Sequence, residues 1–290
     1  MRGERVCQLP PAKRMQTTMN LLRMFARNPE PVAKFVDGRV GYAMGDIHGR
    51  ADLLDAMLAE IERRAVADAR EAGPPILLFL GDYIDRGPDS ARVLDLLVSG
   101  RPSICERRYI RGNHEQAMIA FMAEPFANRR WLVHGGAETM LSYGLKPPPL
   151  VGGTDEDWIV AGDSLAAALP PEHLAFLREL ERYVVLGGYL FVHAGVEVSK
   201  PLEEQSDADL YWSRVRWLNN KRRFTHKVVH GHTPAERPYI DDRRVGLDTG
   251  AYASGVLTAA RFEGEEVSFF AVSSNENRHE APAGVKKSKF

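Results

Sequence analysis

In the first 125 residues of the chain, short apolar runs typical of buried strands alternate with segments whose apolar residues recur at helical spacing. The expected strands are residues 40–44, residues 76–80 and a third strand that ends at residues 109–111; the expected helices are residues 53–61, 91–98 and 113–122. Strands and helices that alternate in this way are typical of parallel strands joined by crossover helices. The pattern therefore predicts a mostly parallel sheet with helices on its faces.

The second half of the chain has a different pattern. Pro170 and Pro171 predict the start of a helix that runs through Leu180. A hairpin is expected around Gly187-Gly188, with strands at residues 183–186 and 189–193. Four more short apolar runs predict strands at residues 228–230, 245–247, 256–261 and 267–271. We expect the hairpin and these strands to form a second, mixed sheet that packs on the first.

Composition divides the chain into one folded domain and two polar ends. Residues 1–36 and 273–290 lack periodic apolar positions, so we expect a partly disordered N-terminal extension and a polar C-terminal tail. Residues 37–272 are expected to form a single domain. Within it, residues 145–157 contain three prolines and two glycines, which predicts a surface loop.

Charge and cysteine content exclude several classes of protein. The chain has 38 Lys and Arg against 39 Asp and Glu, a balance that argues against a general nucleic-acid or membrane-surface binder. Its longest nearly apolar stretch, residues 184–192, is much shorter than the roughly 18 residues of a membrane span. Cys7 and Cys105 are far apart, which gives no support to a disulfide framework or a thiolate metal site. We expect a cytoplasmic protein.

Unusual polar residues occupy the three expected strand-to-helix turns. These turns are Gly45–Gly49 (GDIHG), Gly81–Gly87 (GDYIDRG) and Arg111–Glu115 (RGNHE), and two later strands end at His193 and His232. A single Gly-Asp before a helix is typical of an N-cap. Five such fragments, all at strand ends, instead favour a common site at the carboxyl edge of the sheet. Oxygen and imidazole ligands of this kind suit divalent metals such as manganese, iron or zinc.

The order GDxHG, GDxxDRG, GNHE, strand-end His and Gly-His resembles the calcineurin-like metallophosphoesterases, and among them the serine/threonine phosphoprotein phosphatases. The resemblance covers roughly residues 40–261. Further segments resemble the bacterial and phage branch, namely residues 131–136, 211–214, 231–234 and 247–251, while the eukaryotic SAPNY segment is absent. The resemblance implies an α/β protein with a four-layer α/β/β/α sandwich.

The resemblance also implies six ligands for two divalent metals. Asp46 and His48 would hold the first metal, Asp82 would bridge, and Asn113, His193 and His232 would hold the second. Mn2+ is the expected metal, with Fe, Zn or Ni as alternatives. Together with a bridging hydroxide, such a cluster would carry a net charge of about +1, which favours an anionic substrate. In this family a metal-bound hydroxide attacks phosphorus directly, without a phosphoenzyme.

Four further residues match catalytic positions of the family. Arg86 and Arg214 match arginines that grip the phosphate, which a planar guanidinium can bind through two hydrogen bonds. Arg216, two residues on, is a rival for the second role. His114 matches a general acid that Asp85 orients, because a serine alkoxide leaves poorly unless it is protonated.

The remaining polar residues carry weaker expectations. His230 is a candidate for hydrogen bonding near the metals rather than for a ligand, His134 is a candidate for lining the substrate cleft, and Asp248 is expected to support the site through hydrogen bonds. We expect His173, His226 and His279 at the surface and the four tryptophans mainly in packing.

The favoured function is a serine/threonine protein phosphatase that acts on phosphoproteins or phosphopeptides. The main alternative is a symmetrical diadenosine tetraphosphate hydrolase, although such relatives usually show GNHD and a GDLVxRG-like turn where this chain has Glu115 and Asp85-Arg86-Gly87. Nucleases and cyclic-nucleotide phosphodiesterases commonly carry a further His after Gly-His, where this chain has Thr233-Pro234. A metal-free binding scaffold would have lost ligands, and all six are present. The sequence leaves open whether the protein is a monomer or a dimer.

Overall fold

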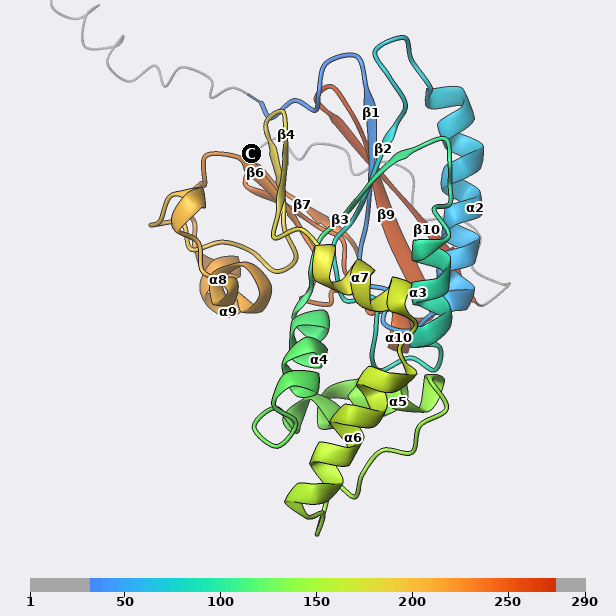
Figure 1. Cartoon of the computed structure of the whole chain (residues 1–290). Coiled ribbons are helices and arrows are strands. Elements are labelled where there is room, and N and C mark those ends of the chain that lie inside the picture. Colours follow the sequence, from blue (N-terminus) through green and yellow to red (C-terminus); the bar gives the residue numbers. More distant parts are fainter. Residues whose placement is uncertain (1–31, 275–290) are drawn as a thin grey trace, which may run out of the picture. The chain divides into compact units, whose positions relative to one another are not determined.

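The computed structural model describes residues 32–274, which contain two five-stranded mixed sheets (Figure 1). In the first sheet the strand order is β10-β9-β1-β2-β3. Its strands are β1 (Val40–Met44), β2 (Ile76–Phe79), β3 (Glu106–Tyr109), β9 (Val256–Glu263) and β10 (Glu266–Ser273). Strands β1, β2 and β3 are parallel, as their alternation with helices predicts, and β9 pairs antiparallel with β1.

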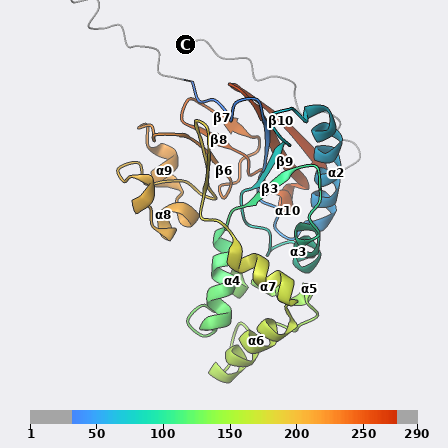
Figure 2. The ribbon, with the colours of Figure 1, turned by 45° about the horizontal axis from the view of Figure 1, so that its top comes forward.

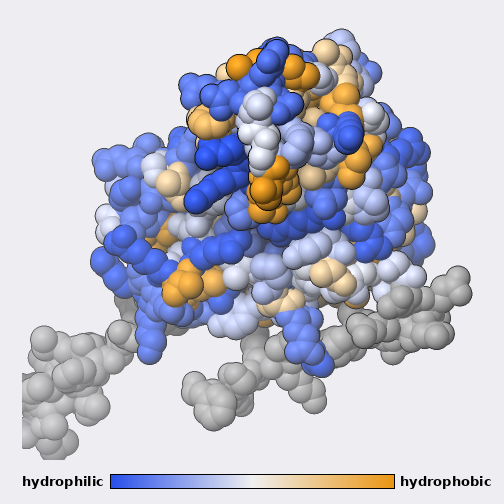
Figure 3. Space-filling view, turned by 90° about the horizontal axis from the view of Figure 1, so that it is seen from below, coloured by the Kyte–Doolittle hydropathy of each residue, from blue (hydrophilic) through white to orange (hydrophobic). Residues whose placement is uncertain are grey.

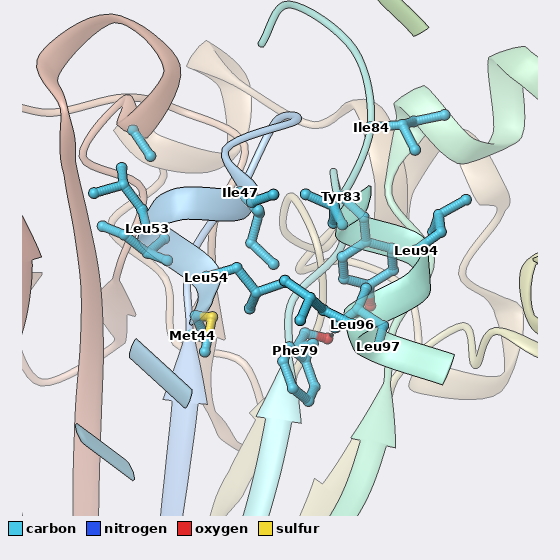
Figure 4. Close-up of a cluster of buried hydrophobic side chains, with 14 of the residues drawn as sticks. Met44, Ile47, Leu53, Leu54, Phe79, Tyr83, Ile84, Leu94, Leu96 and Leu97 are labelled. Atoms are coloured by element: carbon cyan, nitrogen blue, oxygen red, sulfur yellow. Dashed lines mark hydrogen bonds between the residues drawn. The ribbon is translucent and has the colours of Figure 1, made fainter. Parts of the chain in front are cut away.

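The two faces of the first sheet bury different sets of side chains, because successive residues of a strand point to opposite faces. One face packs against helices α2 (Ala51–Asp68) and α3 (Ser90–Val98). Figure 4 shows Met44 and Phe79 from the strands next to Leu54 from α2. Residues of the opposite set, such as Ala43 and Leu78, instead pack toward the second sheet.

The second sheet has the order β4-β5-β6-β8-β7. Its strands are β4 (Val184–Leu186), β5 (Tyr189–Phe191), β6 (Lys227–His230), β7 (Tyr239–Ile240) and β8 (Arg244–Gly246). Phe191 and Val229 belong to the core shared with the first sheet, whereas Leu190 and Val228 pack with residues of α8 (Asp207–Trp212) and α9 (Val215–Asn219). The layers are helices, sheet, sheet and helices, so the expected four-layer α/β/β/α architecture is confirmed.

The expected placement of two late strands is wrong. Residues 256–261 and 267–271 belong to β9 and β10, which extend the first sheet rather than the second. The two strands form a hairpin, and β9 pairs with β1 from Val40 opposite Glu263 to Met44 opposite Ala259. A short apolar run shows that a strand is buried but not which sheet it joins, so this assignment depends on long-range pairing.

Between β3 and β4 the chain forms a group of helices that lies beyond one end of the first sheet, which we call the helical arm (Figure 2). It comprises α4 (Asn113–Ala123), a π-helical turn (Leu132–Gly136), α5 (Ala137–Ser142), α6 (Asp155–Ala168) and α7 (Pro171–Glu179). The patterns predicted α4 and α7. Helix α6 was missed, because the loop expected at residues 145–157 already ends at Thr154, whose side chain caps the helix. Its buried positions include small residues, which weakens the apolar period.

The chain contacts the core before the boundary expected at residue 37. Phe35 exposes only 2% of its surface and stacks on Phe262, and its backbone N–H donates to Gly264 O at 2.8 Å. Residues 1–31 and 275–290, where the extension and most of the tail were predicted, lie outside the described residues. Within the described part of the chain, no helix combines the length and the apolar character that a membrane crossing requires.

Candidate metal centre and active site

The polar residues that follow five strands meet at one edge of the two sheets. Asp46 and His48 follow β1, Asp82 follows β2, Asn113 opens α4 after β3, and His193 and His232 follow β5 and β6. Each of the six exposes 4% or less of its surface. The convergence predicted from the strand ends is therefore present. Because charged and polar groups are rarely buried to this extent without partners, these side chains require neighbours that satisfy them.

Backbone strain is concentrated at the same edge. Among residues 32–274, the non-glycine residues with positive φ are His48, Asp82, Asp85, Arg86 and His232, with φ between 47° and 74°. All five belong to the predicted site. Such conformations cost on the order of 1–3 kcal/mol each and persist only where the surroundings enforce them. The fold thus holds these side chains in place at an energetic cost.

Glu115 is one of the groups that enforce this conformation, a role that the sequence did not reveal. Its carboxylate accepts hydrogen bonds from the backbone N–H groups of Gly112, Asp82 and Tyr83 at 2.9, 3.0 and 2.8 Å. Burial, followed by the neighbouring Asp82 carboxylate, raises the pKa of Glu115 to about 7. Glu115 thus links the turn at Gly81–Gly87 to the turn at Arg111–Glu115 and fixes the position of Asp82 relative to α4.

Asp82 lies at the centre of the buried set. Its Oδ2 is 3.4 Å from His48 Nε2 and its Oδ1 is 3.3 Å from His193 Nε2. His193 Nε2 is also 2.9 Å from Asn113 Oδ1 and 3.2 Å from His232 Nδ1. Asp82 therefore belongs to two groups of possible metal ligands, one with His48 and His114 and the other with His193 and His232. Within each group the ligand atoms lie within 4.8 Å of one another.

The hydrogen bonds of these histidines fit a cation between them. Nδ1 of His48 lies 2.8 Å from Ile84 O, and Nδ1 of His193 lies 2.8 Å from Leu80 O, so each Nδ1 carries a proton and each Nε2 lone pair faces Asp82. Burial lowers the pKa of His48 to about 3. Burial also opposes protonation of His193, but the Asp82 carboxylate outweighs it and raises the pKa. Acceptor atoms that face one another in a buried site require positive charge, and the donor set suits a divalent metal.

Asp46 lies beside this set rather than inside either group. Both of its carboxylate oxygens accept the backbone N–H of His232, at 3.1 and 3.0 Å. Gly231 makes this approach possible, since a Cβ there would lie 2.0 Å from Asp46 Oδ1. Burial, and then the charges of Asp248 and Asp82, raise the pKa of Asp46 well above its usual value. A nearby cation would relieve this repulsion, which is consistent with the expected ligand role.

His114 and Asp85 form a buried pair next to the ligands. His114 Nδ1 lies 2.6 Å from Asp85 Oδ2, and Asp85 also accepts from Trp131 Nε1 at 2.7 Å and from Thr139 Oγ1 at 2.5 Å. Burial opposes protonation of His114, but the Asp82 and Asp85 carboxylates outweigh it and raise the pKa. The sequence missed the hydrogen bonds of Trp131 and Thr139, because both residues come from the helical arm.

Arg86 contacts both halves of the site. Its two terminal nitrogens lie 3.0 Å from His48 Nε2 and 3.0 Å from His114 Nε2, and its guanidinium lies over the Tyr252 ring at 5.0 Å. Its backbone N–H donates to Gly135 O, and Gly135 has a φ of 116° and no space for a side chain beside Arg86. The GlyGly segment at residues 135–136 therefore holds Arg86 in place.

The side chains of the two candidate arginines after α8 have different partners. Arg214 donates from Nε to His232 Nε2 at 2.8 Å. Arg216 instead forms a 3.1 Å ion pair with Glu197 and has a side chain that is 87% exposed. The structure thus places Arg214 at the site and Arg216 away from it.

A cavity of about 800 Å3 opens beside these residues. Its lining comes from the turn after β2, from α4 and the turn after it, from the π-helical turn, and from α8 and the segment that follows it: Arg86, Asn113, His114, Gln116, Ala117, Ala120, Ala127, Asn128, Arg130, Trp131, His134, Trp212 and Arg214. His134 lines the cavity as expected. Trp212 is 49% exposed and donates to Gln116 Oε1 at 2.8 Å, while the other three tryptophans are buried. The cavity provides space for a substrate next to the metal ligands.

The remaining histidines lie apart from the ligand atoms. His230 is buried, but its Nε2 lies 3.0 Å from Arg244 Nη1 and its Nδ1 3.0 Å from Gly231 O, so both nitrogens are occupied. The surface position expected for His173 is wrong: it exposes 2% and contacts Tyr143 Oη at 2.8 Å and Asp95 Oδ1 at 3.2 Å. These partners come from separate segments that the sequence does not connect. His226 is partly buried, and His279 lies outside the described residues.

Comparisons with known proteins agree on the type of site. A family model described as calcineurin-like phosphoesterase matches residues 42–255. Serine/threonine-protein phosphatase 1 of Salmonella typhimurium is 29% identical over 235 residues, which are 77% of this chain and 91% of that protein. Bis(5'-nucleosyl)-tetraphosphatase PrpE [asymmetrical] of Geobacillus thermodenitrificans is 27% identical over 231 residues, which are 76% of this chain and 89% of that protein.

A similar fold is found among solved structures. A crystal structure of a putative diadenosine tetraphosphatase has a TM-score of 0.54 and 19% sequence identity, and the match covers 84% of this chain and 100% of that one. At this identity the likeness concerns the fold alone.

Proposed function

Since this chain belongs to the calcineurin-like phosphoesterase family and is a metal-dependent phosphoesterase hydrolase, we propose that it hydrolyses phosphate monoesters and that its substrates are phosphoserine and phosphothreonine in proteins. The proposal depends on the buried pair of His114 and Asp85, because this pair is suited to protonating a poor leaving group.

The metal centre of the proposed enzyme consists of two divalent ions, with Mn2+ as the metal we expect. Asp82 would bridge, Asp46 and His48 would complete the first site, and Asn113, His193 and His232 would complete the second. Bound divalent ions lower the pKa of coordinated water and polarise phosphoryl oxygens. Glu115 and the strained turns would keep these ligand residues in position before the substrate binds.

The phosphoryl group would be bound by the two arginines that face the site. Arg86 and Arg214 both line the cavity next to the ligands. A guanidinium can donate two parallel hydrogen bonds to a phosphate, and the arginines would also balance its negative charge. A phosphate bound in this way would lie beside the metal ligands, with its ester oxygen toward His114.

The leaving group distinguishes between the candidate substrates. A serine or threonine alkoxide is strongly basic and leaves only if it receives a proton, whereas a nucleotide phosphate leaves readily as an anion. His114 supplies such a proton if its Nδ1 is anchored and its charged form is stabilised. The fully buried Asp85, held by Trp131 and Thr139, provides both effects. This arrangement therefore favours a phosphoprotein substrate.

Hydrolysis of dinucleoside tetraphosphates is the second candidate, because several relatives carry that name. The distinguishing experiment measures kcat/KM with Mn2+ on phosphoserine peptides and on diadenosine tetraphosphate under identical conditions. We expect the peptides to be preferred by at least about tenfold, which corresponds to ~1.4 kcal/mol of transition-state binding. A preference for the dinucleotide would overturn the proposed substrate class.

A further inference from the structure

The cavity beside the metal centre is lined by three arginines and by no carboxylate. Arg86 and Arg214 lie at the ligand end, and Arg130 contributes to the lining from the turn after α4. Asp85 and Asp207 contact lining residues but are themselves hydrogen bonded, to His114 and Gln116. Cationic side chains along a cavity wall attract an anionic group. The two arginines at the ligand end account for one such group, the phosphate that is cleaved.

Arg130 differs from the other two arginines because it has no partner. Arg86 and Arg214 donate to imidazole nitrogens, whereas Arg130 forms no hydrogen bond or ion pair with any residue between 32 and 274. His134, which also lines the cavity, is exposed and equally free of hydrogen bonds within these residues. Two unpaired groups that can carry positive charge thus lie in the cavity lining.

The length of α4 gives the scale of the cavity wall between the metal ligands and the turn that leads to Arg130. Asn113 and Ala120 both line the cavity and are seven residues apart, about 10 Å along a helix axis. Asn128 donates to Ala120 O at 3.1 Å, so the turn that leads to Arg130 packs against the C-terminal part of α4. An extended peptide covers this distance in about three residues. Between the two ends the wall includes Ala117, Ala120 and Ala127, whose small side chains leave room for a peptide.

We propose that Arg130, together with His134 of the same cavity lining, forms a second anion subsite that binds an acidic group about two to four residues from the phosphorylated residue. This inference rests on the proposed phosphoprotein phosphatase function and makes it specific: the preferred substrates are acidic phosphopeptides. The acidic group is either an Asp or Glu carboxylate or a second phosphoryl group, since a guanidinium binds both.

The test compares kcat/KM for phosphoserine peptides that differ only at the positions two to four residues from the phosphoserine. One peptide carries Asp there, one carries Ala, and one carries a second phosphoserine. The measurements are made at low ionic strength, because salt screens exposed charges. In the wild type we expect the Asp peptide to be preferred over the Ala peptide by about fivefold. The doubly phosphorylated peptide shows whether a second phosphate substitutes for the carboxylate.

Arg130→Ala should reduce the Asp-to-Ala ratio to about one, and the ratio is taken within each variant so that changes in overall activity cancel. Arg129→Ala is the matched control, since its guanidinium donates to Phe126 O at 2.7 Å and lies over the Phe126 ring, outside the cavity lining. This variant should keep both the ratio and the overall activity of the wild type.

Three outcomes would contradict the inference: a wild type without an acidic preference, a preference that survives in Arg130→Ala, or an equal loss in both variants. If the wild type cleaves p-nitrophenyl phosphate or a dinucleotide but none of the phosphopeptides, the proposed function fails and the subsite fails with it. Turnover of phosphopeptides without an acidic preference overturns the subsite alone.

Discussion

The metal centre and the exposed part of the cavity wall differ in how firmly their side chains are held. At the strand ends the ligands are almost completely buried and several have strained backbones. On the cavity wall, Trp212 of α8 is half exposed and Arg130 of the arm has no partner in the described part of the chain. The space-filling view from below shows the face on which the arm lies, where apolar patches interrupt a mainly hydrophilic surface (Figure 3).

This difference suggests a division of function. Catalysis by charge stabilisation requires groups that are already oriented before the reaction, and such orientation needs burial and many partners. Recognition of varied proteins tolerates exposed side chains that adjust to their ligand. We therefore expect substitutions of the buried site residues to abolish the chemistry and substitutions of the exposed residues of the cavity wall to alter substrate preference.

The largest effect is expected from Asp82→Asn. Because Asp82 contacts both groups of ligand atoms, the variant should lose affinity for both metals, whereas His48→Ala should weaken mainly the first site. Activity should fall by about 1,000-fold or more in Asp82→Asn, since the metals supply several kcal/mol of transition-state stabilisation. Elemental analysis after dialysis measures the metal content. Loss of a single metal in both variants would contradict the bridging role.

A smaller effect is expected from the arginines. Arg86→Ala and Arg214→Ala should each lower kcat/KM for phosphate esters roughly 10- to 100-fold, because each removes charged hydrogen bonds to the phosphoryl group. Metal content should stay at the wild-type level. Arg216→Ala is the control, since its side chain pairs with Glu197 in solvent. A greater loss in Arg216→Ala than in Arg214→Ala would show that the roles of the two are exchanged.

The smallest effect is expected from Trp212→Phe on the α8 side of the cavity. The variant removes the hydrogen bond to Gln116 and part of an exposed wall, so KM for phosphopeptides should rise by about two- to tenfold. The kinetics with p-nitrophenyl phosphate, which is too small to span the cavity, and the metal content are measured in parallel. An equal effect on both substrates, or a loss of metal, would mean that the exposed cavity wall and the metal centre are not separate in function.

The sequence predicted the metal centre better than the arm, and the reason is physical. Each motif turn is local: Gly45–Gly49 and Gly81–Gly87 specify their own conformation, and parallel strands bring such turns to one edge. The helical arm depends on weaker signals. Helix α6 buries Trp158, Ala161 and Gly162 among polar residues, so its period is hard to recognise.

Long-range contacts could not be predicted either. Asp85 depends on Trp131 and Thr139, which are 46 and 54 residues away in sequence. No local pattern connects them to the second motif turn. The same limit explains why β9 was expected in the wrong sheet and why the buried contacts of His173 were missed.

The central claim is that His114, oriented by Asp85, protonates an alkoxide leaving group, and leaving-group dependence tests it most directly. His114→Asn removes the acid, and kcat is compared on a phosphoserine peptide and on p-nitrophenyl phosphate, whose phenolate leaves without a proton. We expect a loss of about 100- to 10,000-fold on the peptide and a loss of less than about tenfold on the aryl ester. The variant should retain both metals, although His114 Nε2 lies 3.9 Å from Asp82 Oδ2. Equal losses on the two substrates, or the loss of a metal ion, would contradict the account.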